Sequence, residues 1–318
     1  MRQPLDRLSS ASPASLNPGC GLCALRSRRL FSGLLATAGV ASLGGMAALG
    51  GGILTPASAQ AQDGVQGDVG RASRFTKLVS AEQVEAAAAQ QYQQMLREAT
   101  SQRALGPTDN PQVARLRSIS QRIVPYTAAW NGRARNWQWE VNLLGSDQIN
   151  AFCMPGGKIA FYYGILKKLQ LSDDEVATIM GHEVAHALRE HARERMGKTA
   201  ATQLGAGLLS GLLGLGGAGD ALLNMGGQLL TLRFSREDET EADIVGMDLA
   251  ARAGYDPAAG VSLWQKMMSA SRGAPPQWLS THPAGEARIR EIQGKLPKVQ
   301  GLYRQADKPD RYFGPPKA

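Results

Sequence analysis

The sequence predicts an α+β fold that is mainly helical, with a small β-sheet and one helix that carries the motif HExxH. Three observations predict it. Apolar residues recur every three or four positions in 110–123 and in 172–186, as in helices with one buried face. Two short segments, 137–144 and 158–163, have the alternation and the apolar and aromatic content of strands. Ser172 and Glu175 form a capping box that opens the HExxH helix.

The composition is that of a globular protein, with 43% hydrophobic and 19% charged residues in 318. The formal net charge of +8 comes partly from the N-terminus, where residues 1–59 hold five arginines and one aspartate. Residues 60–318 carry 30 basic and 26 acidic side chains, which is a mild excess. No nucleic-acid-binding module and no basic stripe interleaved with aromatics occurs, so we expect no nucleic-acid partner.

Residues 1–59 have the pattern of an export signal. The pair Arg28-Arg29 precedes an uncharged run, 30–62, and Pro56-Ala57-Ser58-Ala59 has the small-x-small pattern of a cleavage site. The paired arginines indicate a twin-arginine signal, and hence a periplasmic location. The alternative is an uncleaved membrane anchor, since the run is long enough to span a bilayer. After cleavage Cys153 would be the only cysteine, so we expect no internal disulfide.

The elements follow in order. A polar, Gly-rich segment, 60–74, reads as a flexible linker, and 75–300 as the folded domain. Helices are expected at 80–102 and 110–123, then the two strands, and then the HExxH helix from Ser172. Later helices are expected at 237–252, 257–269 and 286–295, and the Pro-containing tail 301–318 is expected to be extended.

The segment 204–232 is rich in Leu, Gly and Ala, and Asp220 is its only charged residue before Arg233. It could form a loose apolar lid or a wall that faces the substrate. A membrane-dipping hairpin is the alternative, although its uncharged part, 204–219, is shorter than a membrane span needs. We therefore expect peripheral membrane contact, if any, through this segment.

The motif itself places His182 and His186 four residues apart, on one face of the helix. Two imidazoles so placed can bind one zinc ion. Glu183 lies about 100° round the helix, where it can reach a water on the metal and act as general base. His191 is rotated away from this face and is expected at the surface or at the helix end.

A catalytic zinc needs a third protein ligand from another element. The acidic segment 235–243 offers Glu239 and Asp243, which share a helix face because they are four residues apart. One can bind zinc while the other accepts the free N–H of a zinc-binding histidine. The other acids of the segment are expected to point elsewhere: Glu237, Asp238 and Glu241.

Five motifs in order resemble the periplasmic, BepA/LoiP-type members of the HtpX, Oma and Ste family of zinc metallopeptidases. They are His182-Glu-x-x-His186, Glu239-x-x-x-Asp243, Asn150-Ala-Phe-x-x-Pro-Gly-Gly157, Ala253-Gly-Tyr-Asp-Pro257 and Thr281-His-Pro283. The resemblance spans about residues 75–300. It implies a zincin-like domain with one zinc per chain, held by His182, His186 and Glu239, with Asp243 behind them.

The resemblance also implies the activity, a zinc-dependent endopeptidase with Glu183 as general base. The expected substrates are polypeptides, namely unfolded or misassembled envelope proteins, in a quality-control role. The alternative is a chaperone-like periplasmic binding protein with a latent zinc site. The sequence specifies no oligomeric state.

Two further features are expected to take part in the site. An edge strand beside the metal is expected to pair with an extended substrate, and it involves Asn150, Ala151, Phe152, Gly156 and Gly157. His282 is expected to act at the site. It would either donate a hydrogen bond to the developing oxyanion or occupy the open zinc position in a resting state.

Overall fold

The computed structural model describes residues 64–205, 229, 232–271, 276–283 and 285–317. All of them belong to one compact unit, Thr55–Ala318. The predicted export signal, 1–59, and most of the apolar segment 204–232 lie outside the described residues. Among the helices within the described ranges, none is both long enough and apolar enough to cross a bilayer.

A three-stranded sheet has the order β1-β3-β2, with β1 at Glu140–Leu144, β2 at Ala151–Met154 and β3 at Lys158–Tyr162. β1 runs parallel to β3, and β2 runs antiparallel to it. β2 is therefore an edge strand, as predicted, and its outer edge is unpaired within the described part of the chain.

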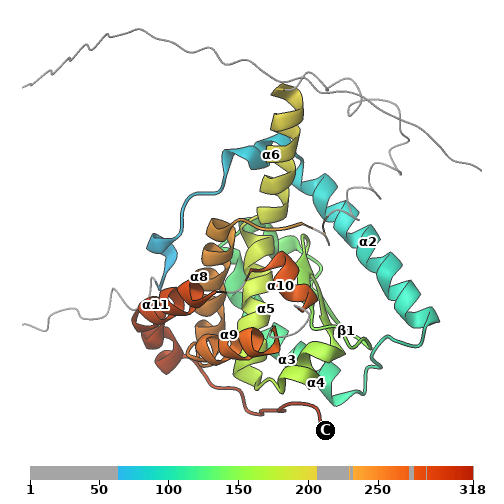
Figure 1. Cartoon of the computed structure of the whole chain (residues 1–318), viewed down its shortest axis with the longest axis vertical. Helices are drawn as coiled ribbons and strands as arrows, with labels where there is room; N and C mark the ends of the chain where they lie inside the picture. Colours follow the sequence, from blue (N-terminus) through green and yellow to red (C-terminus); the bar gives the residue numbers. More distant parts are fainter. Residues whose placement is uncertain (1–63, 206–228, 230–231, 272–275, 284, 318) are drawn as a thin grey trace, which may run out of the picture. The chain divides into compact units, whose positions relative to one another are not determined.

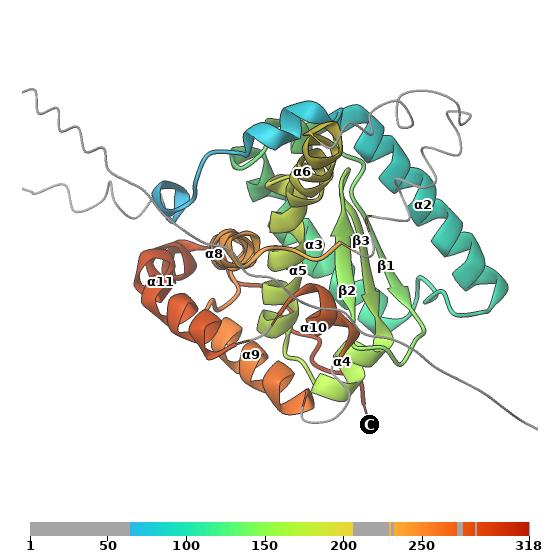
Figure 2. The same cartoon turned by 45° about the horizontal axis from the view of Figure 1, so that its top comes forward.

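Helices cover both faces of this sheet (Figure 2). α2 (Ala81–Ser101) lies along one face, and α3 (Pro111–Ile123) and α5 (Asp173–Leu188) lie along the other. Side chains of β3 alternate accordingly, because successive residues of a strand point to opposite faces. Ile159 and Phe161 enter the main core with α3 and α5, whereas Ala160 packs in the smaller cluster with α2.

The HExxH helix α5 packs against α8 (Arg236–Arg252) in the middle of the domain (Figure 1). The two backbones meet at Gly181 and Gly246, where a Cβ on either residue would lie 2.5 Å from a backbone atom of the other helix. Only glycine permits this approach. Because His182 follows Gly181 directly, the crossing holds the HExxH face beside the part of α8 that carries Glu239 and Asp243.

Capping boxes open both of these helices. Ser172 and Glu175 bond reciprocally at the start of α5, as predicted. Ser235 and Asp238 do the same at the start of α8. The other α-helices within the described ranges are α4 (Tyr163–Leu169), α6 (His191–Gly205), α9 (Ala259–Ala270), α10 (Gln277–Thr281) and α11 (Glu286–Gln305). Short 3₁₀ helices lie at Gln66–Asp68, Arg74–Leu78, Val124–Ala129 and Gly132–Asn136. The predicted fold class, mainly helical with a small sheet, is confirmed.

The C-terminal helix is longer than predicted. α11 runs ten residues past Lys295 and contains Pro297, so the predicted helix end was wrong. Val299 and Leu302 are buried, and their packing outweighs the hydrogen bond lost at the proline. Residues 306–317 contain no helix, so the extended tail begins at 306 rather than at 301.

Residues 60–74 were predicted to form a flexible linker. The described part of this segment, 64–74, instead contacts the domain. Val65 is fully buried, and Asp68 pairs with Lys298 of α11 at 2.6 Å. The guanidinium of Arg189 donates to the carbonyl of Gly70. The Gly-rich, polar composition of the segment did not predict these contacts. Val65 is the buried apolar side chain among them.

Candidate metal centre

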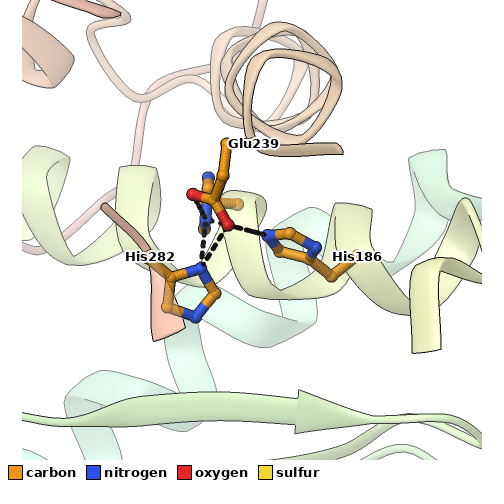
Figure 3. Close-up of side chains that lie close together, drawn as sticks. His186, Glu239 and His282 are labelled. Carbon is orange, nitrogen blue, oxygen red and sulfur yellow. Dashed lines mark hydrogen bonds and ion pairs between the residues drawn. The ribbon is translucent and has the colours of Figure 1, made fainter. Parts of the chain in front are cut away.

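Three elements bring four side chains to one point. α5 supplies His182 and His186, α8 supplies Glu239, and His282 follows α10 directly. One ligand atom from each lies within 4.8 Å of the others, and all four residues are at most 3% exposed. Figure 3 shows Glu239 reaching from its helix toward His186 and His282.

The spacing of these atoms fits a tetrahedral metal ion. A zinc ion with four bonds of about 2.0–2.1 Å at tetrahedral angles holds its ligand atoms about 3.3 Å apart. His182 Nε2 lies 3.1 Å from His186 Nε2 and 3.3 Å from His282 Nδ1. Glu239 Oε1 lies 3.5 Å from His186 Nε2 and 2.9 Å from His282 Nδ1, and Glu239 Oε2 lies 3.7 Å from His182 Nε2. The donor set consists of three imidazole nitrogens and one carboxylate oxygen. Zinc binds both kinds of ligand in proteins.

Asp243 fixes the orientation of His182. Its Oδ1 lies 3.0 Å from His182 Nδ1 and accepts the N–H there. His182 Nε2 is then left with its lone pair directed into the cluster, as a metal ligand requires. Burial opposes ionisation of Asp243, but Arg288 lowers its pKa to about 2, so the carboxylate is charged at neutral pH. Burial, followed by the neighbouring His182, holds the pKa of His186 well below its ordinary value, which keeps that imidazole neutral.

Arg288 of α11 binds both carboxylates of the site. It donates to Glu239 Oε2 at 2.6 Å and to both oxygens of Asp243 at 2.7 Å. Its guanidinium lies 3.8 Å from the ring centre of Trp264, in the geometry of a cation–π contact. Arg288 thereby leaves Glu239 Oε1 free to face the histidines. Sequence analysis missed this residue, because no periodicity or short motif distinguishes it from the other basic residues of α11.

Replacing Arg288 with methionine is expected to lower the free energy of unfolding by about 3–5 kcal/mol, because two buried carboxylates would lose their cation. Arg290→Met is the matched control, since Arg290 lies on the same helix and its side chain is 68% exposed. We expect that control to change stability by less than about 0.5 kcal/mol. Denaturant unfolding of both variants measures the difference, and equal effects would contradict the role given to Arg288.

Glu183 lies beside the cluster. It is 3% exposed, and the indole N–H of Trp278 donates to its Oε1 at 2.6 Å. His282 Nε2 lies 3.6 Å from the same oxygen. Trp278 is fully buried and stacks on Trp264, so its indole is held in place. This positions the Glu183 carboxylate toward the site, and sequence analysis gave no sign of the tryptophan's part in it.

A cavity of about 330 Å³ opens on the cluster. Glu183, His186 and His282 are among the residues that line it. The edge strand lines one side with a run of residues that includes Asn150, Ala151, Phe152, Cys153 and Met154. Apolar side chains of Leu229, Leu232 and Phe234 also belong to the lining. Two described residues of the predicted lid segment, Leu229 and Leu232, thus do lie at the cavity.

Gly156 and Gly157 lie elsewhere, which corrects their assignment to the substrate strand. Both have positive φ, 85° and 78°, and form the turn between β2 and β3. A Cβ on Gly157 would lie 2.8 Å from the Trp139 ring, so the close approach that needs glycine is to this tryptophan. Neither glycine lines the cavity.

His191 is also placed differently from the prediction. It is 1% exposed, and its Nδ1 lies 2.9 Å from His186 Nδ1. Its Nε2 lies 2.7 Å from Glu241 Oε2, so Glu241 does not point away either. The prediction was wrong because α5 ends at Leu188 and the backbone turns at Glu190, where φ is 58°. His191 begins a new helix, and the angle of 100° per residue cannot be extended across that turn.

Comparison with known proteins gives a family. The model of peptidase family M48 matches residues 111–296. The chain is 37% identical over 166 residues to the mitochondrial metalloendopeptidase OMA1 of Schizosaccharomyces pombe, a match that covers 51% of this chain and 48% of that protein. It is 30% identical over 221 residues to OMA1 of Saccharomyces cerevisiae, with 65% and 62% covered. It is 26% identical over 174 residues to the β-barrel assembly-enhancing protease of Escherichia coli, with 52% and 36% covered. The match spans less than two thirds of the length of each of these relatives.

Proposed function

The chain belongs to peptidase family M48, and on that basis we propose that it is a zinc-dependent metalloendopeptidase. One observation carries the proposal. The histidines of the HExxH motif and Glu239 converge in a buried cluster, and Glu183 and His186 are among the residues that line a cavity there. Family membership alone would not require these side chains to meet.

The residues divide the chemistry between them. His182, His186 and Glu239 would hold the metal, and Asp243 and Arg288 keep two of these ligands oriented. Zinc bound there would supply a Lewis acid that polarises a carbonyl and lowers the pKa of a water molecule. Glu183 accepts the proton of the attacking water and returns it to the leaving amine.

His282 stands at the fourth corner of the tetrahedron. Its Nδ1 is 3.3 Å from His182 Nε2 and 2.9 Å from Glu239 Oε1. Of the two roles that the sequence left open, this position supports the second, in which the imidazole occupies the coordination position that water needs. In our proposal the arrangement is a closed one, and hydrolysis requires His282 to leave that corner.

The edge strand suggests how a substrate binds. β2 lines the cavity and has a free edge, so an extended polypeptide can pair with it backbone to backbone. A chain without stable structure offers extended residues to such a site along its whole length, whereas a folded protein offers them only in exposed loops, termini and edge strands. Unfolded polypeptides are therefore the proposed substrates, with cleavage inside the chain.

The cellular setting is proposed from the sequence and the relatives. The export pattern of residues 1–59 supports a periplasmic location. A bacterial relative is named for enhancing β-barrel assembly, which supports a part in the quality control of misassembled envelope proteins. Recovery of the mature chain in the cytoplasmic fraction of producing cells would contradict this setting.

The function is tested with one polypeptide in two states, native ribonuclease A and its reduced, carboxymethylated form. We expect the zinc-loaded protein to cleave the unfolded form at least about 100-fold faster, because the folded form must open before it can pair with β2. A chelator should stop cleavage, and added zinc should restore it. Binding of the unfolded form without cleavage would favour the chaperone-like alternative and contradict the proposal.

A further inference from the structure

We propose that His191 and Glu241 are positioning residues, which form a hydrogen-bonded chain that fixes the tautomer and orientation of His186 as a metal ligand. The inference rests on the metal site of the proposed function. Neither residue is a ligand or touches a reacting atom. They act through His186, and they come from two different helices: His191 is the first residue of α6, and Glu241 lies in the second turn of α8.

The chain consists of two short contacts, of which the first is buried and the second is partly buried, since the Glu241 side chain is 22% exposed. His186 Nδ1 lies 2.9 Å from His191 Nδ1, and His191 Nε2 lies 2.7 Å from Glu241 Oε2. His186 and His191 are 3% and 1% exposed, so water does not compete for these atoms. Glu241 Oε1 is bound by the guanidinium of Arg189 at 2.8 Å.

The direction of each hydrogen bond can be derived by starting from Arg189, at the end of the chain that is farthest from the metal site. Arg189 can only donate, so it takes one oxygen of Glu241, and the other oxygen is left to accept from His191 Nε2. In the tautomer of His191 that the proposed chain requires, the proton is on Nε2 and the lone pair is on Nδ1. His186 must then donate its own Nδ1–H to that lone pair. The remaining nitrogen, His186 Nε2, presents its lone pair to the cluster, as metal binding requires.

The two histidines of the motif are thus oriented in different ways. His182 donates its Nδ1–H directly to the carboxylate of Asp243. His186 reaches a carboxylate only through His191, which acts as a spacer that accepts on one side and donates on the other. The orientation of His186 therefore depends on the first residue of α6, immediately after the turn at Glu190.

The main test is Glu241→Gln. A glutamine has one acceptor oxygen where two donors, Arg189 and His191, now face the carboxylate. If Arg189 keeps that oxygen, the amide N–H₂ faces His191 Nε2 and favours the reversed chain, which puts a proton on His186 Nε2. We expect zinc affinity to fall about 10–100-fold, as is typical when a partner behind a ligand is lost. Glu237→Gln is the matched control, because it removes the same charge from an exposed site on the first turn of the same helix.

A second pair of variants separates the hydrogen bonds from packing. His191→Leu removes both bonds, whereas His191→Gln keeps one acceptor and one donor on the same side chain. We expect the leucine variant to lose about 10–100-fold in zinc affinity and the glutamine variant to recover part of that loss. Circular dichroism of the zinc-free variants shows whether they fold. Should His191→Leu fail to fold, the comparison of Glu241→Gln with Glu237→Gln decides alone.

Zinc affinity is measured by competition with a chromophoric chelator, which needs no peptidase assay. Wild-type affinity for Glu241→Gln, equal to that of Glu237→Gln, would overturn the chain while leaving the metal site in place. A wild-type protein that binds no zinc would refute the proposed function itself, and the chain with it. The predicted result is tight binding by the wild type and by Glu237→Gln, with weakened binding by Glu241→Gln.

Discussion

Glu183→Gln is expected to lower kcat/KM for an unfolded polypeptide by about 10²–10⁴-fold, because a general base contributes that much. Glutamine has nearly the shape of glutamate and still offers an oxygen to the indole N–H of Trp278, which now donates to Glu183 at 2.6 Å. It cannot accept a proton from water. The substitution therefore removes one chemical step and leaves the surroundings intact.

Two measurements accompany that assay. Zinc content of Glu183→Gln should equal that of the wild type, since Glu183 is not one of the four side chains that meet at the tetrahedral cluster. Glu237→Gln should keep wild-type activity, because Glu237 is exposed and lies on the first turn of α8. Undiminished cleavage by Glu183→Gln would contradict the role assigned to this residue, and so would a loss of activity explained wholly by lost zinc.

Glu239→Gln is expected to abolish both zinc binding and peptide hydrolysis. Zinc affinity should fall by more than about 100-fold, which exceeds the effect of losing a residue behind a ligand. The carboxylate is the only negative charge in the four-residue cluster, where its neighbours are three imidazoles. The amide would also leave Arg288 facing a neutral group at a contact that is now 2.6 Å long.

Structural damage could imitate this result, so the zinc-free forms are compared first. The zinc-free Glu239→Gln protein should unfold in a single cooperative transition, although at lower denaturant because Arg288 has lost a partner. Loss of zinc from a folded variant identifies Glu239 as a ligand. Retention of zinc and of proteolysis by the variant would contradict that assignment.

Short sequence patterns predicted which helices carry the residues of this site and which of these residues share a helix face. The spacing of four residues put His182 and His186 on one face, and the capping box at Ser172 placed the start of their helix. The same spacing brought Glu239 and Asp243 to one side of α8, and the structure places both beside His182. Such features depend on a few adjacent residues and on helix geometry. Their roles as ligand and partner remain predictions until zinc is measured.

Tertiary contacts explain what the sequence did not reveal. Trp278 and Arg288 reach the site from elements more than 40 residues away from the acids that they bind. His191 was misplaced because one residue with positive φ, Glu190, ends the helix before it. A proline is ordinarily expected to end a helix, but α11 continues past Pro297. Val299 is buried beyond the proline, and this tertiary contact cannot be inferred from the proline alone.

The most direct test is the zinc content of the purified protein, followed by its X-ray absorption spectrum. We predict one zinc per chain, with nitrogen and oxygen ligands at about 2.0–2.1 Å and the scattering of at least two imidazoles. A protein without stoichiometric metal would contradict the account. A spectrum with a sulfur ligand at about 2.3 Å would do so as well, because it would place the ion away from His182, His186 and Glu239.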